Sequence, residues 1–194
     1  EVDAEIDNGR FGMAEETGRI LNDAITRGAK DGQGLGEAIG RYMNHTADQF
    51  PNRAVSILAT GATLGIPVTV HVAVGTDIIH MHPSADGAAI GATSLLDFRR
   101  LTAVVAGMEG GVYLNVGSAV ILPEVFLKTL SLGRNLGHPI ANITTVNMDF
   151  LSHYRPQTIV VRRPTQKGGQ GYSLTGHHEI MLPLLAAAVL EELG

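Results

Sequence analysis

Gly75-Thr76-Asp77, followed by His80 and His82, forms the first group of residues in this chain whose types and spacing suit ligand binding. It comes directly after an apolar run, where an aspartate can accept hydrogen bonds from a ribose hydroxyl or an amine. Histidines at positions i and i+2 point the same way in an extended chain, which is the geometry of half a metal site. A metal would need a third ligand from elsewhere, so we assign no metal ligands and keep structural roles open for both histidines.

A second group, Gly117-Ser118-Ala119, stands between an apolar run (Val112–Val116) and a helix-forming run with Pro123 near its start. A strand that ends in such a turn and leads into a helix leaves backbone N–H groups free at the helix N-terminus, where the helix dipole favours an anion. In an open α/β sheet, ligands bind at the carboxyl ends of the strands. The pattern therefore predicts an anion or nucleotide site. Ser118 lacks the GxSxG surroundings of a nucleophilic serine.

The third group is His177-His178-Glu179, which follows a Gly-rich stretch at residues 164–176 and begins a closing helix. Either histidine can act as a general acid or base near neutral pH, with Glu179 orienting the ring. In the alternative interpretation, Thr175 caps the helix and Glu179 complements its positive end. The spacing is not HExxH, so it does not indicate a metalloprotease.

The elements that must position these residues alternate along the chain. Three-to-four-residue apolar spacing predicts helices at residues 13–29, 35–50, 54–64, 93–107 and 177–193. Short apolar runs predict strands at residues 68–74, 112–116, 142–150 and 158–161, with a loop at 164–176. The run at 68–74 is apolar almost throughout, which is typical of a strand buried on both faces of a parallel sheet. The sequence therefore predicts an α/β layered fold with a mostly parallel sheet and N-terminal helices.

Composition narrows the function classes. The 194 residues suit one domain, residues 1–194, with an N-terminal helical arm at residues 1–50 and a core at residues 51–194. The chain is 44% hydrophobic and 17% charged, so we expect a homo-oligomer that covers apolar surface.

A net charge of −5 without a basic stripe argues against nucleic acid as a partner. With no cysteine, disulfides and thiolate metal sites are excluded. No apolar run reaches the roughly 20 residues of a membrane span and no signal peptide is visible, so we expect a cytoplasmic protein.

From about residue 65 to residue 190 the order of these pieces resembles deoxyhypusine synthase and its relatives. The similar features are Ile66-Pro67-Val68, the Thr76-Asp77 pair, Asp-Phe-Arg-Arg at 97–100, the strand and turn at 112–119, the Gly-rich stretch and Leu-Pro-Leu-Leu at 182–185. The resemblance implies a three-layer Rossmann-like fold for the core and NAD as the cofactor.

The departures from that family concern its chemistry. Where the family has a glycine triplet followed by Lys-His-His, this chain has Gly117-Ser118-Ala119 followed by Val120-Ile121-Leu122. The family's Trp-Gly-Lys motif, whose lysine carries the covalent imine, has no counterpart because the chain has no tryptophan. Lys167 lies in the corresponding region but outside such a motif. The resemblance therefore implies a nucleotide-type pocket without the spermidine-cleaving reaction.

The leading hypothesis is an enzyme, or a former enzyme, whose reaction is unknown. It would bind an NAD-type nucleotide, or another small anionic ligand, across residues 75–77 and 117–119. Five residues would supply acid–base or polar groups around it: His80, His82, His177, His178 and Glu179. Two alternatives stay open: a metal-dependent hydrolase that uses the histidines, and a non-catalytic oligomeric binding protein.

Overall fold

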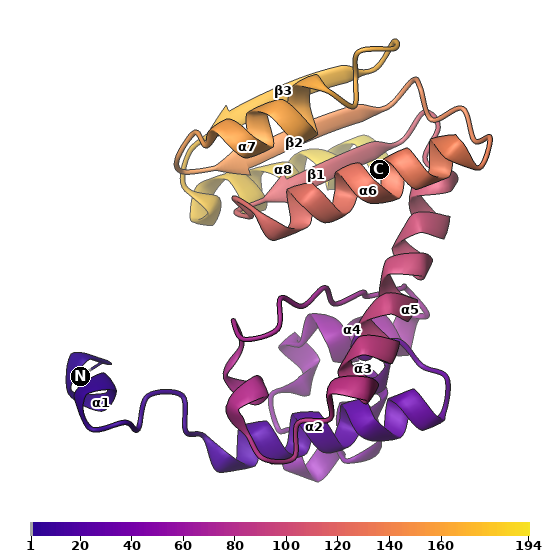
Figure 1. The fold of residues 1–194 in the computed structure, drawn as a ribbon. Helices are drawn as coiled ribbons and strands as arrows, with labels where there is room; N and C mark the ends of the chain where they lie inside the picture. The colour runs from indigo at the N-terminus through magenta and orange to yellow at the C-terminus, as the bar shows by residue number, and fades with distance from the viewer. Residues whose placement is uncertain (1) are drawn as a thin grey trace. The chain divides into compact units, whose positions relative to one another are not determined.

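The computed structural model describes residues 2–194, which form two compact units (Figure 1). The first unit ends at Leu101 and the second runs from Thr102 to Gly194. The boundary falls inside helix α5 (Gly87–Ala106). Residue 50, where the sequence suggested the end of a helical arm, lies within the first unit.

The first unit is helical. Its elements are α1 (Val2–Asp7), α2 (Glu15–Lys30), α3 (Leu35–His45), α4 (Ile57–Leu64), the start of α5, and the 3-10 turns η1 (Ala47–Gln49), η2 (Arg53–Val55) and η3 (Ile78–Met81). The helices predicted at 13–29, 35–50 and 54–64 are thus present with shorter bounds. Their apolar faces meet in one core, whose buried members are Ala24, Ile25, Leu35, Ile39, Ala89 and Ile90.

The predicted strand at residues 68–74 is wrong, since these residues have no regular secondary structure. They pack on helices instead: Val70 and Val72 lie against the core of the first unit. The Val70 N–H donates to Asp97 Oδ2 at 2.9 Å, so a buried side chain takes the place of a sheet partner. A continuous apolar run can satisfy burial in either way, and periodicity does not distinguish them.

The second unit contains a parallel sheet in the order β1-β2-β3. Its strands are β1 (Val112–Val116), β2 (Thr144–Asp149) and β3 (Gln170–Thr175), and Asn115 of β1 lies opposite Asn147 of β2. The connecting segments are α6 (Ile121–Asn135), the short α7 (Tyr154–Pro156) with the π-helical segment η4 (Gln157–Arg162), and the closing α8 (His178–Leu193). The predicted α/β class with a parallel sheet is confirmed, as are two of its strands and the closing helix.

Two predictions for the second unit are wrong. Residues 158–161, expected as a strand, are helical within η4, where Thr158, Ile159 and Val160 are buried. The expected loop at residues 164–176 contains β3. Every residue of β3 is exposed, so the strand carries no alternating burial pattern that a sequence could display.

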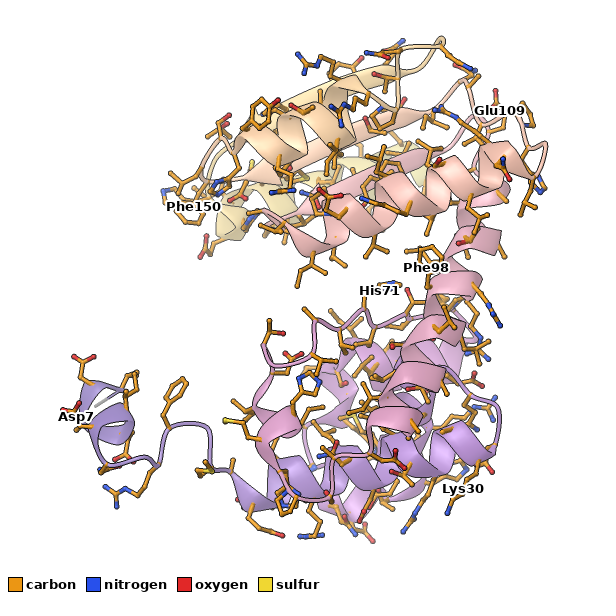
Figure 2. The ribbon with its side chains drawn as sticks, viewed as in Figure 1. Asp7, Lys30, His71, Phe98, Glu109 and Phe150 are labelled. Atoms are coloured by element: carbon orange, nitrogen blue, oxygen red, sulfur yellow. The ribbon has the colours of Figure 1, made fainter. Side chains whose placement is uncertain are left out.

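Burial in the second unit is one-sided along β1. Tyr113 stacks on Phe126 of α6 with ring centroids 3.6 Å apart, whereas Val112, Leu114 and Val116 are exposed. Helix α8 has no buried residue. Figure 2 shows Phe150, just beyond β2, and Glu109, which precedes β1, at opposite ends of this unit. Across residues 2–194, no helix combines the length and apolar character needed to cross a membrane.

Candidate functional site

The carboxyl edge of the sheet is where β1, β2 and β3 end. Two glycines extend the sheet hydrogen bonding past the strand ends: the Gly117 N–H donates to Met148 O at 2.9 Å, and the Gly176 N–H donates to Asp149 O at 3.0 Å. Gly117 has a φ of +67°, in the left-handed region that favours glycine. This conformation turns the chain out of β1 and toward α6.

The turn after Gly117 leaves backbone donors unused. Ser118 Oγ accepts from the Leu122 N–H at 3.3 Å, which caps the first turn of α6. The N–H groups of Ser118, Ala119 and Val120 have no hydrogen-bond partner within residues 2–194. Consecutive free N–H groups at a helix start form a concave set of donors that suits an oxyanion.

Two buried asparagines, Asn115 and Asn147, stabilise this turn through hydrogen bonds. Asn115 Nδ2 donates to Ser118 O at 2.9 Å and to Asn147 Oδ1 at 2.7 Å. Both side chains are almost wholly buried, and Asn115 Oδ1 has no partner. The sequence analysis did not single out Asn115. The signal for it was a polar side chain in the middle of the apolar run Val112–Val116.

His178 is the histidine that the fold brings to the turn. A Cβ added at Gly117 would lie 3.2 Å from His178 Nε2, so the imidazole lies directly against the glycine. Both ring nitrogens of His178 are enclosed and without a hydrogen-bond partner. A neutral imidazole has one donor and one acceptor, so the ring keeps both functions available for a ligand.

His177 and Glu179 have a different position. Both are exposed, and His177 precedes α8, where its carbonyl oxygen accepts from the Ile180 and Met181 N–H groups at 3.1 and 3.0 Å. Glu179 makes no hydrogen bond or ion pair through its carboxylate within residues 2–194. Of the predicted group His177-His178-Glu179, the structure therefore places His178 alone against the turn.

The acidic residues near this edge are already engaged. Asp149 is buried, and its Oδ1 accepts from the Phe150 N–H at 2.8 Å. Glu124, one turn into α6, pairs with Lys128 and with Arg155 Nη1, the latter at 2.6 Å. Hydrogen bonds from Lys128 and Arg155 lower the pKa of Glu124. Glu124 is thus an ion-paired surface residue.

The other predicted site residues lie in the first unit. Gly75, Thr76 and Asp77 form an exposed turn, in which Thr76 Oγ1 donates to Ala73 O at 2.6 Å. The Gly75 N–H donates to His80 Nδ1 at 3.1 Å, which closes this turn on His80. Gly75 has a φ of +96°, again in the left-handed region.

The backbone at His80 is not extended, so the condition under which the His80 and His82 side chains point the same way is not met. His80 lies in the 3-10 turn η3, and His82 follows it. His82 has its own partners, since its Nδ1 lies 2.7 Å from Ser84 Oγ and accepts from the Ser84 N–H at 3.1 Å. His80 Nε2 is enclosed without a partner. Neither unit, within residues 2–194, contains a group of three or more metal-ligating side chains.

Comparisons of the chain with family models, with characterised proteins and with solved structures gave no match. The resemblance to the deoxyhypusine synthase family therefore stays a prediction.

Proposed function

We propose that the second unit binds a small anionic ligand at the turn between β1 and α6, with an NAD-type nucleotide as the first candidate. The observation that carries the proposal is the run of unpartnered N–H groups at Ser118, Ala119 and Val120. Donors fixed by the backbone bind phosphate oxygens without any side-chain reorganisation. A Rossmann-like fold, in which a pyrophosphate occupies this position, is part of the same proposal.

His178 supplies a polar group beside these donors. Its unpartnered ring nitrogens suit a ligand hydroxyl, which both donates and accepts. A nucleotide carries phosphate oxygens and ribose hydroxyls a few ångströms apart, so it combines both kinds of group.

Titration calorimetry with NAD⁺, ADP and inorganic phosphate tests the proposal. We expect NAD⁺ and ADP to bind, with phosphate weaker. Binding by phosphate alone would overturn the nucleotide part, and no heat from any of the three at millimolar concentration would overturn the site.

Two matched pairs of variants locate the site. Gly117→Ala and Gly137→Ala both place a side chain on a left-handed backbone, but Gly137 has open space around it, whereas Gly117 lies against His178. We expect Gly117→Ala to weaken binding about tenfold or more and Gly137→Ala to leave it unchanged, since a lost charge-assisted hydrogen bond costs roughly that much. His178→Ala should likewise weaken binding more than His177→Ala. Equal effects within either pair would move the site elsewhere.

Self-association is a separate proposal. Helix α8 has no buried residue and exposes apolar side chains, including Ile180, Leu184 and Leu190. Light scattering of the eluting peak in size exclusion measures the mass directly, and a monomer at all concentrations would contradict the expected homo-oligomer.

A further inference from the structure

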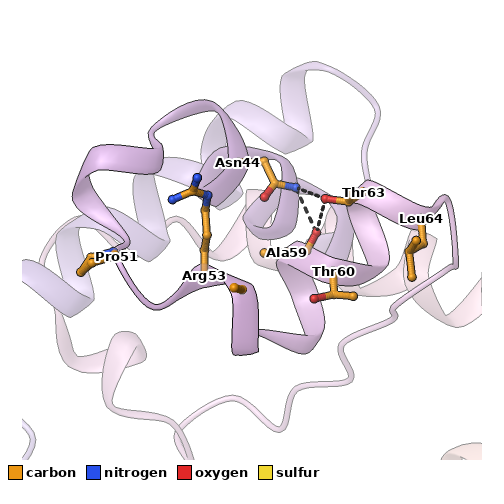
Figure 3. Close-up of a pocket in the computed structure, with 8 residues that line it drawn as sticks. Asn44, Pro51, Arg53, Ala59, Thr60, Thr63 and Leu64 are labelled. Atoms are coloured by element: carbon orange, nitrogen blue, oxygen red, sulfur yellow. Dashed lines mark hydrogen bonds between the residues drawn. The ribbon is translucent and has the colours of Figure 1, made fainter.

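An open cavity of about 440 Å³ in the first unit, most of whose lining residues are exposed, contains none of the predicted site residues (Figure 3). It lies where the turn η2 and helix α4 meet the end of α3. Its volume is within the roughly 300–1,000 Å³ of small-molecule sites. The lining divides into a polar group (Asn44, Arg53, Thr60 and Thr63) and an apolar group that includes Pro51, Ala54 and Leu64.

Arg53 is the charged residue of the cavity. Its Nη1 donates to Ala47 O at 3.2 Å, which ties one nitrogen of the guanidinium to the backbone. No carboxylate pairs with it within residues 2–194, and no acidic residue lines the cavity. A positioned guanidinium has the planar pair of donors that matches a carboxylate.

Asn44 contributes a hydrogen-bond acceptor, whereas Arg53 contributes donors. Its Nδ2 donates to Ala59 O at 3.0 Å and to Thr63 Oγ1 at 3.1 Å, so the amide orientation is set by two partners. Figure 3 shows the amide nitrogen toward Thr63 and the oxygen on the side where Arg53 lies. That oxygen has no partner within the described residues and is therefore free to accept a hydrogen bond. The Thr60 hydroxyl is also without a partner.

We propose that this cavity binds a small carboxylic acid that carries a hydroxyl or amino group next to its carboxylate. Arg53 binds the carboxylate, Asn44 Oδ1 accepts from the hydroxyl or amine, and the apolar group contacts the side chain of the acid. A phosphate fits less well, because Asn44 Oδ1 is an acceptor and cannot pair with an ionised phosphate oxygen. The site is independent of the proposed anion site in the second unit.

The test is calorimetry or amide chemical-shift mapping with lactate, alanine, acetate and inorganic phosphate. We expect lactate or alanine to bind, and the one that binds identifies hydroxy acids or amino acids as the natural class. Acetate should bind at least tenfold more weakly, because it cannot donate to Asn44. Equal binding of acetate and lactate, tighter binding of phosphate, or no binding by any of them would overturn the proposal.

Three variants place the binding in the cavity. Arg53→Gln should weaken lactate or alanine binding about tenfold to a hundredfold, the range for a charged hydrogen-bonded contact. Arg99→Gln removes an exposed arginine of the same unit outside the cavity and should leave binding unchanged. Ala54→Trp fills the cavity while keeping Arg53 and should abolish binding.

Far-ultraviolet circular dichroism confirms that each variant is folded, which is expected because Arg53, Ala54 and Arg99 are all exposed. An equal loss in Arg53→Gln and Arg99→Gln would show that general charge, not the cavity, attracts the acid. Unchanged binding in Ala54→Trp would equally contradict the proposal.

Discussion

The two units differ in how they use buried polar groups. In the first, the carboxylate of Asp97 is fully buried and its Oδ2 accepts from the N–H groups of Gly36 and Val70, each at 2.9 Å. In the second, buried Asn115 supports a turn whose own N–H groups have no partner. The Asp97 carboxylate links three segments that are distant in sequence. The second arrangement leaves donors available, so it is the second that suits a ligand.

The largest expected effect is a loss of stability when a side chain is removed from the core of the second unit. Phe126 is 1% exposed and stacks on Tyr113 at an interplanar angle of 6°. Phe126→Ala should lower the free energy of unfolding by about 3–5 kcal/mol, as is typical of a buried aromatic ring. Urea denaturation and hydrogen exchange of the β1 and β2 amides measure it. The control is Phe150→Ala, because Phe150 is 59% exposed; a similar loss in both variants would contradict the assigned core.

The next effect concerns the fastening role of Asp97 in the first unit. Asp97→Ala removes the acceptor of two buried N–H groups and should cost about 2–4 kcal/mol, with Asp97→Asn intermediate. The measurement is the urea midpoint, together with hydrogen exchange at Gly36 and Val70. Asp48→Ala, at an exposed position of the same unit, should be nearly neutral. If the Gly36 and Val70 amides kept their protection in Asp97→Ala, the fastening role would be refuted.

These contrasts also explain which parts of the fold were predictable from sequence. Helices such as α2 and α3 were, because their apolar residues repeat at helical spacing and share one core. The runs at 68–74 and 112–116 are both apolar, yet the second alone is a strand: it pairs with β2, whereas the Val70 N–H of the first donates to Asp97. That contact joins residues 27 apart, and local pattern does not report it. Strand β3 is exposed throughout and has no burial pattern to detect.

The candidate site was predictable to a similar degree. The Gly117 turn followed from a strand running into a helix, and His178 followed from its place at the start of α8. Its separation from His177 required the geometry, because neighbouring residues on a helix start point in different directions. A common direction for His80 and His82 depended on extended backbone, and the chain forms η3 there.

The third prediction concerns the stability of the second unit at alkaline pH. Burial raises the pKa of Tyr113 to about 12. Because the folded state holds this proton more tightly than the unfolded state, the stability contributed by Tyr113 is complete below pH 10 or so and is lost as the pH rises toward about 12. A rise from 10 to about 12 corresponds to about 3 kcal/mol of unfolding free energy once Tyr113 is fully ionised. We expect Tyr113→Phe to flatten the loss of unfolding free energy in this range, and Tyr172→Phe, at an exposed position, to leave it intact. If the unfolding free energy fell equally steeply with pH in both variants, the pH dependence could not be assigned to Tyr113.

The smallest expected effect is a loss of stability of the first unit at acid pH, which depends on His71. Burial lowers the pKa of His71, and the nearby Asp97 charge opposes this shift. His71 Nε2 lies 3.0 Å from Thr69 Oγ1, and Figure 2 shows the residue in the segment before η3. A lowered folded pKa means that the unfolded state takes up the proton first. The stability contributed by neutral His71 is therefore present above pH 6.5 or so and is lost as the pH falls through the folded value.

An NMR titration of the His71 ring protons measures that pKa directly, and urea unfolding at about pH 7.5 and about pH 5 measures its consequence. His71→Gln should reduce the loss of stability on acidification, whereas His45→Gln, at an exposed position, should not. Asp97→Asn provides the sharper test, because removing the opposing charge should lower the pKa of His71 further. A rise in that variant would mean that His71 does not sense the carboxylate that fastens the first unit.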